Sequence, residues 1–297
     1  MPQAAKSLLA LVVAVGLVVG AVFVRSALDN KKVSDAVRVR LTCDPAVIEA
    51  CRKAAAADER IELKEEEPAK TRARLRDLEP GEEPGLDAWV TVGPWMAMTE
   101  GARAGQPALA RSVAAVATTP VNLVVRPGNE ACASKPVACD KVRNIGILPP
   151  PVDGVGLAAS ASIVATAAGI PVADLDRDAL ISGAGADPLR MLNKLAKSTG
   201  LDAVNASFGP AQAIVTTAAA ARAIAPGRVA TVHLNVRAVM EVALLSDGAA
   251  GVMAEGSPAG QALRRFMVDA GWEGSPQPSG LPDAGVLAAL QEAWTTT

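Results

Sequence analysis

The stretch RSVAAVATTPVNLVVRP, residues 111–127, holds two apolar strand-like runs that meet at Thr118-Thr119-Pro120. Proline fixes its own φ, has no N–H to donate to a sheet, and pushes the preceding residue towards extended geometry. A small polar pair followed by proline inside an apolar strand therefore predicts a strand that bends, changes its pairing partners, or passes from one sheet to another.

Short apolar strands alternate with helical segments on both sides of this stretch. The predicted strands are Val37–Thr42, Arg60–Lys64, Leu86–Val92, Arg228–Val236 and Val239–Leu245. The predicted helices are Asp44–Ala57, Trp95–Ala104, Gly154–Ala168, Asp187–Lys197, the alanine-rich Phe208–Ala223, Ser257–Ala270 and Leu281–Trp294. Such alternation is typical of an α/β fold with mostly parallel strand pairing.

The start of the first helix has a local signature. Asp44 accepts well from first-turn N–H groups, and Pro45 suits the first helical position. Residues 65–83 carry charges of both signs and end in Pro and Gly, which predicts a solvated helix or loop.

The composition disfavours several classes of function. The net charge of −2 provides no basic footprint for nucleic acid. Aromatic residues make up 2% of the chain and the single histidine is His233, which argues against stacked-ring sites, His-based acid–base chemistry and multi-His metal sites. Neither a GxSxG motif nor a paired-carboxylate motif stands out, and the Gly-rich residues 183–188 lack the Lys, Ser or Thr of a phosphate loop. We therefore expect a protein that is not an enzyme and that needs neither cofactor nor metal.

The segment Leu8–Val24 is an uncharged apolar run. Its length is at the lower limit for spanning a bilayer and exceeds a usual signal-peptide core. We expect an uncleaved single-pass anchor with the bulk of the chain outside the cell membrane. A cleaved signal and a buried core helix remain alternatives.

Four cysteines occur as two close pairs, Cys43 with Cys51 and Cys132 with Cys139. Neither pair has zinc-ligand spacing, and an even count after an export-like segment fits two short-loop disulfides. Cross-pairing between the two sets, or four buried free thiols, are the alternatives.

Four phrases resemble the type 2 periplasmic substrate-binding fold. They are Leu86–Val90 (LDAWV), Val116–Val125 (VATTPVNLVV), Ser257–Leu263 (SPAGQAL) and the helix Leu281–Trp294. The branch that they resemble is the extracellular solute-binding domains of actinobacterial membrane-anchored proteins. No single phrase is decisive, but all four occur in the family's order.

The resemblance implies two α/β lobes that close on a small solute in the cleft between them. Residues 1–36 would be the anchor and linker, residues 37–118 with 234–297 the first lobe, and residues 119–233 the second. The implied function is a membrane-anchored extracytoplasmic solute-binding protein, or a sensor domain derived from one, working with envelope or transporter proteins. The alternative is a non-catalytic assembly partner in an envelope complex that has kept the fold and lost the ligand.

Ligands of open α/β sheets bind beyond the carboxyl ends of strands, at helix N-termini. That rule selects Thr42, Trp95, Thr118, Thr119 and Ser160 as candidate ligand-binding residues. Each also has a structural alternative, as backbone partner, core side chain or helix face.

The sequence departs from the family's anion-binding members at one corner. They place Ser or a similar residue after the first strand, where this chain has Thr42-Cys43-Asp44. A carboxylate and a disulfide there make the corner less favourable for an oxyanion.

Overall fold

The structure is a computed structural model that describes residues 38–126, 145–182, 185–194, 211–224 and 230–296. Residues 39–297 form one compact unit. The predicted anchor Leu8–Val24 and the predicted pair Cys132–Cys139 lie outside the described residues. Within the described ranges, no helix combines the length and apolarity needed to cross a bilayer.

Seven strands form one sheet in the described part of the chain, in the order β2-β1-β3-β7-β4-β6-β5. Their bounds are β1 Val39–Cys43, β2 Ile61–Glu65, β3 Ala88–Val92, β4 Ser112–Val125, β5 Ile145–Gly146, β6 Ala213–Thr217 and β7 Ala230–Leu244. Pairing is parallel within β2-β1-β3 and between β5 and β6, whereas β7 runs antiparallel to β3 and β4, and β6 antiparallel to β4. The α/β class is thus confirmed, but parallel pairing holds only at the two ends of the sheet.

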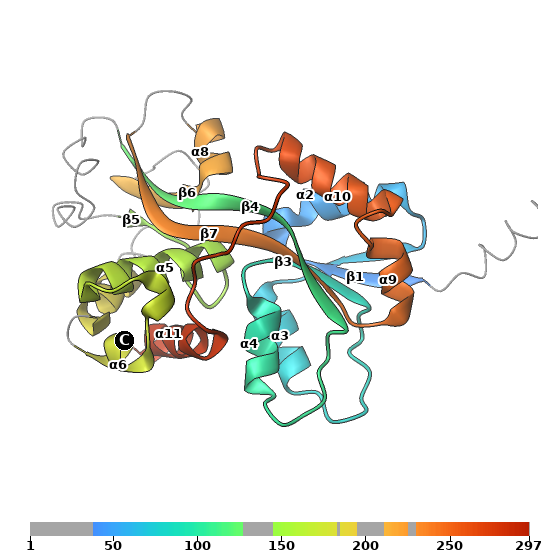
Figure 1. Ribbon diagram of the computed structural model, residues 1–297, viewed down its shortest axis with the longest axis horizontal. Helices are drawn as coiled ribbons and strands as arrows, with labels where there is room; N and C mark the ends of the chain where they lie inside the picture. The colour runs from blue at the N-terminus through green and yellow to red at the C-terminus, as the bar shows by residue number, and fades with distance from the viewer. Residues whose placement is uncertain (1–37, 127–144, 183–184, 195–210, 225–229, 297) are drawn as a thin grey trace, which may run out of the picture. The chain divides into compact units, whose positions relative to one another are not determined.

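The two long strands β4 and β7 run through the centre of the sheet and connect its ends (Figure 1). Their register shifts between Pro120 and Asn122, and β4 acquires its second partner, β6, from Val121 onward. On β7 the backbone of Asn235 has φ 55°, in the left-handed region. The strand β4 is therefore irregular where Thr118-Thr119-Pro120 predicted it, but β4 keeps β7 as a partner on both sides of the triplet and gains β6 after it.

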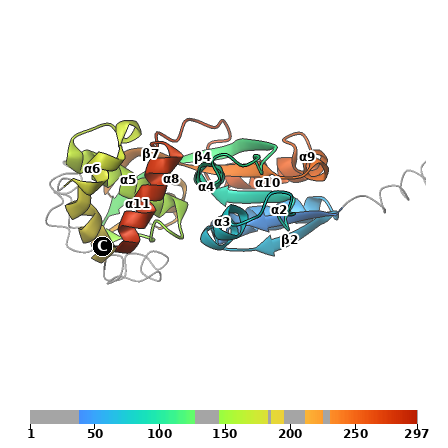
Figure 2. The same cartoon turned by 90° about the horizontal axis from the view of Figure 1, so that it is seen from below.

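Helices cover the sheet on both sides. Figures 1 and 2 show α2 beside α10 on one side of the first three strands and α3 beside α4 on the other, while α5, α6 and α11 gather at the β5–β6 end. The helical elements include η1 Pro45–Val47, α2 Ile48–Ala57, α3 Pro68–Arg76, α4 Trp95–Ala102, α5 Gly154–Ala168, η4 Val172–Asp174, α6 Arg177–Ile181, α8 Ala218–Ile224, α9 Asp247–Met253, α10 Pro258–Asp269 and α11 Ala284–Thr296, and residues 185–194 are also helical.

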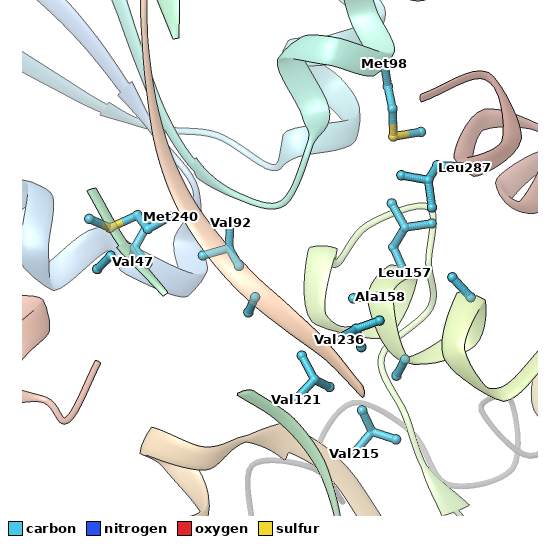
Figure 3. Close-up of a cluster of buried hydrophobic side chains, with 14 of the residues drawn as sticks. Val47, Val92, Met98, Val121, Leu157, Ala158, Val215, Val236, Met240 and Leu287 are labelled. Atoms are coloured by element: carbon cyan, nitrogen blue, oxygen red, sulfur yellow. The ribbon is translucent and has the colours of Figure 1, made fainter. Parts of the chain in front are cut away.

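A continuous apolar core joins both ends of the sheet. Figure 3 shows part of it, with Val92 and Met240 near the first strands and Val121, Val215 and Leu157 near the β5–β6 end. A separate cluster on the other face of β3 is built around two fully buried tryptophans, Trp89 and Trp95. Burying each large apolar side chain contributes about 1.5–3 kcal/mol, so both clusters stabilise the unit substantially.

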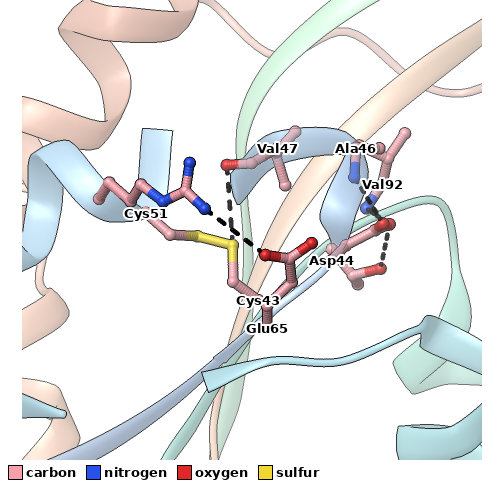
Figure 4. Close-up of a disulfide and its surroundings, with 9 residues drawn as sticks. Cys43, Asp44, Ala46, Val47, Cys51, Glu65 and Val92 are labelled. Carbon is pink, nitrogen blue, oxygen red and sulfur yellow. Dashed lines mark hydrogen bonds and ion pairs between the residues drawn. A yellow bond between two sulfur atoms is a disulfide. The ribbon is translucent and has the colours of Figure 1, made fainter. Parts of the chain in front are cut away.

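The predicted disulfide Cys43–Cys51 is confirmed (Figure 4). It links the last residue of β1 to α2 across a sequence separation of 8 residues. A loop of that size restricts the unfolded chain by about 2–3 kcal/mol. For these two cysteines the free-thiol and cross-pairing alternatives do not hold.

The predicted helix Phe208–Ala223 is wrong in its centre. Residues 213–217, AIVTT, form the fully buried strand β6, and only Ala218–Ile224 is helical. Ile, Val and Thr are β-branched and favour extended geometry, and β6 gains partners from β4 and β5 that lie far away in sequence. The two predicted strands 228–236 and 239–245 are one strand, β7.

Candidate functional site: a cavity at three helical starts

A cavity of about 600 Å³ lies where β3 and β6 end and where η1, α5 and α8 begin. We call it the Asp153 cavity. Its walls are Ala46, Val92, Leu148, Asp153, Val155, Gly156, Val215, Thr216, Thr217, Ala219, Ala220, Ala270 and Trp272. Residues from both ends of the sheet therefore face one space.

Backbone N–H groups at helical starts carry partial positive charge and usually attract anions. Here the chain supplies the anions itself. Asp44 Oδ1 accepts from Ala46 N at 2.9 Å in front of η1, and Asp153 Oδ1 accepts from Gly156 N at 2.6 Å in front of α5. The predicted cap at Asp44 is confirmed, and these N–H groups are already paired with carboxylates.

Asp44 is a buried side chain, 5% exposed. Its second oxygen accepts from Thr91 Oγ1 at 3.2 Å and from Val92 N at 3.3 Å (Figure 4). Burial raises the pKa of this carboxyl above its usual value, and the three hydrogen bonds oppose that rise. Asp44 thus joins the end of β1 to the end of β3.

Asp153 is the one charged side chain among the residues that line the Asp153 cavity. Its pKa is raised to about 6, chiefly by burial and also by the nearby charge of Asp44, while hydrogen bonds from Gly156 N and Val155 N oppose the rise. At neutral pH the carboxylate is mostly ionised. It would repel an oxyanion and attract a cation.

A close contact between backbones places Asp153. A Cβ added at Gly154 would lie 2.0 Å from Val92 O, so only glycine allows α5 to start this close to the end of β3. The resulting approach brings the caps of η1 and α5 near each other.

The opposite wall offers hydroxyl groups and one aromatic ring. Thr216 and Thr217 end β6, and Thr217 Oγ1 accepts from Ala220 N at 3.1 Å. Trp272 follows α10 and is partly exposed at the cavity. A cavity lined by both an indole ring and a carboxylate suits a solute with an apolar or cationic part.

Three of the predicted site residues lie in the interior. Thr42 is 2% exposed within β1, and Trp95 is fully buried with its indole N–H donating to Val92 O at 2.8 Å. Ser160 is fully buried in α5, and its hydroxyl has no partner among the described residues. None of the three belongs to the walls of the Asp153 cavity.

The two threonines of the bend point to opposite faces of β4. Thr119 Oγ1 accepts from Ala219 N at 3.3 Å, next to the Asp153 cavity, whereas Thr118 Oγ1 accepts from Gln277 N at 3.4 Å on the other face. The structure therefore places Thr119, and not Thr118, beside this cavity.

Sequence reasoning missed Asp153, Thr216, Thr217 and Trp272. An Asp before a Gly-rich helix start is a capping signal that could have selected Asp153. Thr216 and Thr217 were hidden because their segment was interpreted as helix. Across the described residues, no three His, Cys, Asp or Glu side chains lie close enough together to hold a metal ion.

Comparison with known proteins gives structural neighbours only. No family model matches the chain, and no curated protein matches it in sequence. The periplasmic molybdate-binding protein of Azotobacter vinelandii is 16% identical over 80% of this chain and 100% of its own, with a TM-score of 0.46. The sulfate-binding protein of Mycobacterium tuberculosis is 15% identical over 86% and 96%, with a TM-score of 0.44.

The regulatory domain of OxyR2 from Vibrio vulnificus is 10% identical over 78% of this chain and 96% of its own, with a TM-score of 0.42. Solute-binding proteins are thus among the solved structures similar to this chain, which is the resemblance that its sequence motifs predicted. A fold by itself does not assign a function, because function depends on the residues of the site.

Proposed function

We propose that this chain is an extracytoplasmic solute-binding protein that holds a small neutral or cationic solute in the Asp153 cavity. The observation that carries the proposal is a cavity of about 600 Å³ whose walls come from both ends of one sheet. Concave sites of this size with a few polar groups are the usual form of small-molecule sites.

The charge of the cavity supports the choice of solute class. Asp153 is its charged wall residue, Asp44 lies behind it, and the N–H groups of Ala46 and Gly156 are already bonded to these two carboxylates. An oxyanion would meet repulsion where it would need donors. An ammonium or polar neutral solute would meet Asp153 and the hydroxyls of Thr216 and Thr217.

The strands β4 and β7, which run through both proposed lobes, support a mechanism in which the lobes close on the solute. In the proposed division, residues 37–118 with 234–297 form one lobe and residues 119–233 the other. The register shift after Pro120 and the left-handed Asn235 lie near the two division points. Bulged, irregular strand positions such as these can absorb the backbone changes of a hinge.

Attachment and compartment belong to the same proposal. The apolar run Leu8–Val24 supports a single-pass membrane anchor. The Cys43–Cys51 disulfide supports an oxidising, extracytoplasmic compartment. We propose that the tethered domain presents its solute to envelope or transporter proteins.

Asp44 and Asp153 also form the kind of titratable pair that an enzyme site needs. Their bonds to the starts of η1 and α5 account for both as structural caps. We therefore propose binding and not catalysis.

The test is a thermal-shift screen of the full-length chain with small amines, polyols, amino acids, sulfate and molybdate. We expect amines or neutral polar solutes to raise the melting temperature and the two oxyanions to have no effect. Asp153→Asn keeps an oxygen that can accept from the helix start but removes the negative charge. It should weaken the binding of an amine about tenfold.

Asp176→Asn is the matched control, because Asp176 also caps a helix, at Ala179 N, but is exposed and outside the cavity walls. A response to the oxyanions alone would contradict the proposed solute class. No response to any solute would favour the alternative of an envelope assembly partner that has lost its ligand.

A further inference from the structure

The first part of β4 is an uncovered edge of the sheet. Residues 112–115 pair with β7 on one side, whereas β6 pairs with β4 only from Val121 onward, so within the described part of the chain no strand covers their other side. All of residues 112–115 are exposed, with Val113 46% exposed. Such an edge presents unpaired N–H and C=O groups to solvent. We call residues 112–115 the open edge of β4.

The open edge lacks features that usually prevent a strand from pairing with another chain. Natural edges carry lysine, inward-facing charges or proline, or are covered by a helix or loop. The sequence of the open edge, SVAA, has no charge and no proline. The edge is therefore available for a further strand.

The same side of β4 already accepts an antiparallel partner a few residues further on. Thr118 N donates to Glu273 O at 3.0 Å, and Glu273 N donates to Thr118 O at 2.7 Å. A register shift between Ala115 and Ala117 separates this bridge from the open edge. The segment that supplies Glu273 thus leaves residues 112–115 uncovered.

A small apolar cavity, of about 150 Å³, adjoins the open edge. Ala114 lies opposite Val242 in the β4–β7 register, and both line the cavity. Leu244, Met253 at the end of α9 and Leu263 of α10 are further walls. Side chains that lie opposite each other on neighbouring strands share one face of a sheet. A strand added beside Ala114 can therefore place an apolar side chain in this cavity.

The size of the open edge favours a peptide over a second copy of this chain. Residues 112–115 span roughly 13 Å, and a contact of that length and one strand wide is small. Each partner of a stable dimer usually buries about 800 Å². Antiparallel pairing of two open edges would also bring only Ser112 and Ala114 of the copy to the cavity, and these side chains are small.

The charges around the cavity indicate an uncharged occupant. Glu255 and Arg264 line the cavity, and they form an ion pair with each other. Arg264 Nη2 also donates to Gly274 O at 2.5 Å. Because these charged groups already have partners, the cavity suits an apolar side chain.

We propose that the open edge of β4 binds an extended peptide segment of a partner protein, which adds to the sheet and places one leucine-sized apolar side chain beside Ala114. Backbone hydrogen bonds to residues 112–115 supply the affinity, and the cavity selects the side chain. No residue of β4 lines the Asp153 cavity, so this site does not depend on the solute bound there.

The test is fluorescence anisotropy of a fluorescein-labelled peptide, Lys-Thr-Val-Thr-Leu-Thr-Val-Thr-Lys-amide, titrated with the full-length chain. We expect saturable binding, and at least tenfold weaker binding when alanine replaces the leucine. Two further peptides carry methyl groups on alternate backbone nitrogens, one on each of the two sets. Alternate N–H groups of a strand point to opposite sides, so one methylated peptide should bind at least tenfold more weakly and the other should not.

A variant of the chain tests the cavity. Ala114→Leu changes an exposed residue and fills the cavity from β4 itself, so it should remove the preference for the leucine peptide over the alanine peptide. Ala56→Leu, at an exposed position of α2 outside the cavity walls, is the matched control and should keep that preference. In the wild-type chain, the leucine peptide should slow amide hydrogen exchange in residues 112–115, as measured by mass spectrometry.

Four results would contradict the proposal. They are the absence of saturable binding, two methylated peptides that behave alike, and a preference for leucine that Ala114→Leu leaves unchanged. The fourth is slowing of exchange in residues 112–115 that grows with the concentration of the chain alone, which would assign the open edge to a second copy.

Discussion

The two faces of the β4–β7 pair border buried or half-buried carboxylates in opposite situations. On one face Asp44 and Asp153 accept from the backbone of two helical starts, and both are hydrogen-bonded. On the other face Glu241 has a buried oxygen without a partner among the described residues. The same type of group is thus hydrogen-bonded as part of the architecture on one face and unsatisfied on the other.

The difference shows in how each acid titrates. Burial raises the pKa of Asp153 to about 6, against the opposing hydrogen bonds from Gly156 and Val155, whereas burial alone raises the pKa of Glu241 to about 7. A carboxylate that is held by helix N–H groups keeps most of its charge at neutral pH. An unsatisfied carboxylate loses its charge more easily and costs the folded state stability.

The start of α5 approaches the end of β3 closely, so a change there should have the largest effect. Gly154 follows Asp153, with space for no Cβ beside Val92 O. Gly154→Val should destabilise the fold on the order of 4 kcal/mol or prevent folding, because the obstructing atom is backbone. Urea unfolding, or soluble yield if the variant does not fold, measures this.

Gly251→Ala is the control for that substitution. Gly251 lies in α9, and a Cβ added there would meet open space, so alanine at this position should stabilise the fold by about 0.5–1 kcal/mol. If Gly154→Val were as stable as the wild type, the close approach of α5 to β3 would not hold.

Glu241→Gln should have the next largest effect, and the effect should depend on pH. The folded pKa, about 7, is above the ordinary 4.5, so the unfolded chain loses its proton first and wild-type stability falls as pH rises from about 4.5 to 7. Each unit of difference between the folded and unfolded pKa values is worth ~1.4 kcal/mol. Above pH 7 the ionised Glu241 therefore lowers the free energy of unfolding by about 3 kcal/mol.

Glutamine cannot ionise, so the variant should not lose stability from this cause as the pH rises. We expect it to be more stable than the wild type at pH 8 and close to it at pH 4.5, as measured by urea unfolding at both values. Glu62→Gln leaves Glu241 in place and changes an exposed residue, so it should be as stable as the wild type at both pH values. Equal stability of Glu241→Gln and the wild type at pH 8 would mean that Glu241 has a partner in the folded chain.

Local sequence signals predicted the parts of the fold that depend on neighbouring residues. Pro120 predicted the bend of β4, and Asp44 with Pro45 predicted the start of η1, because proline geometry and side-chain capping act within a few residues. Cys43 and Cys51 were paired correctly because they are close in sequence.

Features that depend on distant pairing were harder to predict. The segment 213–217 is bordered by alanines that favour helix, and only its pairing with β4 and β5 makes it a strand. The Asp153 cavity needs the ends of β3 and β6 to meet, which no local pattern encodes. The separation of Thr118 from Thr119 could have been predicted, because adjacent strand residues always face opposite sides.

That separation gives the smallest expected effect and the sharpest contrast between the two faces. Thr119→Val and Thr118→Val each remove one hydroxyl acceptor, from Ala219 N and Gln277 N respectively, and should each cost about 1 kcal/mol in urea unfolding. Their effects on binding should differ, because only Thr119 lies beside the Asp153 cavity. Thr119→Val should weaken the binding of the solute identified by thermal shift, and Thr118→Val should leave the affinity for that solute unchanged. Equal weakening by both variants would mean that the two faces act as one site, and the comparison between them would fail.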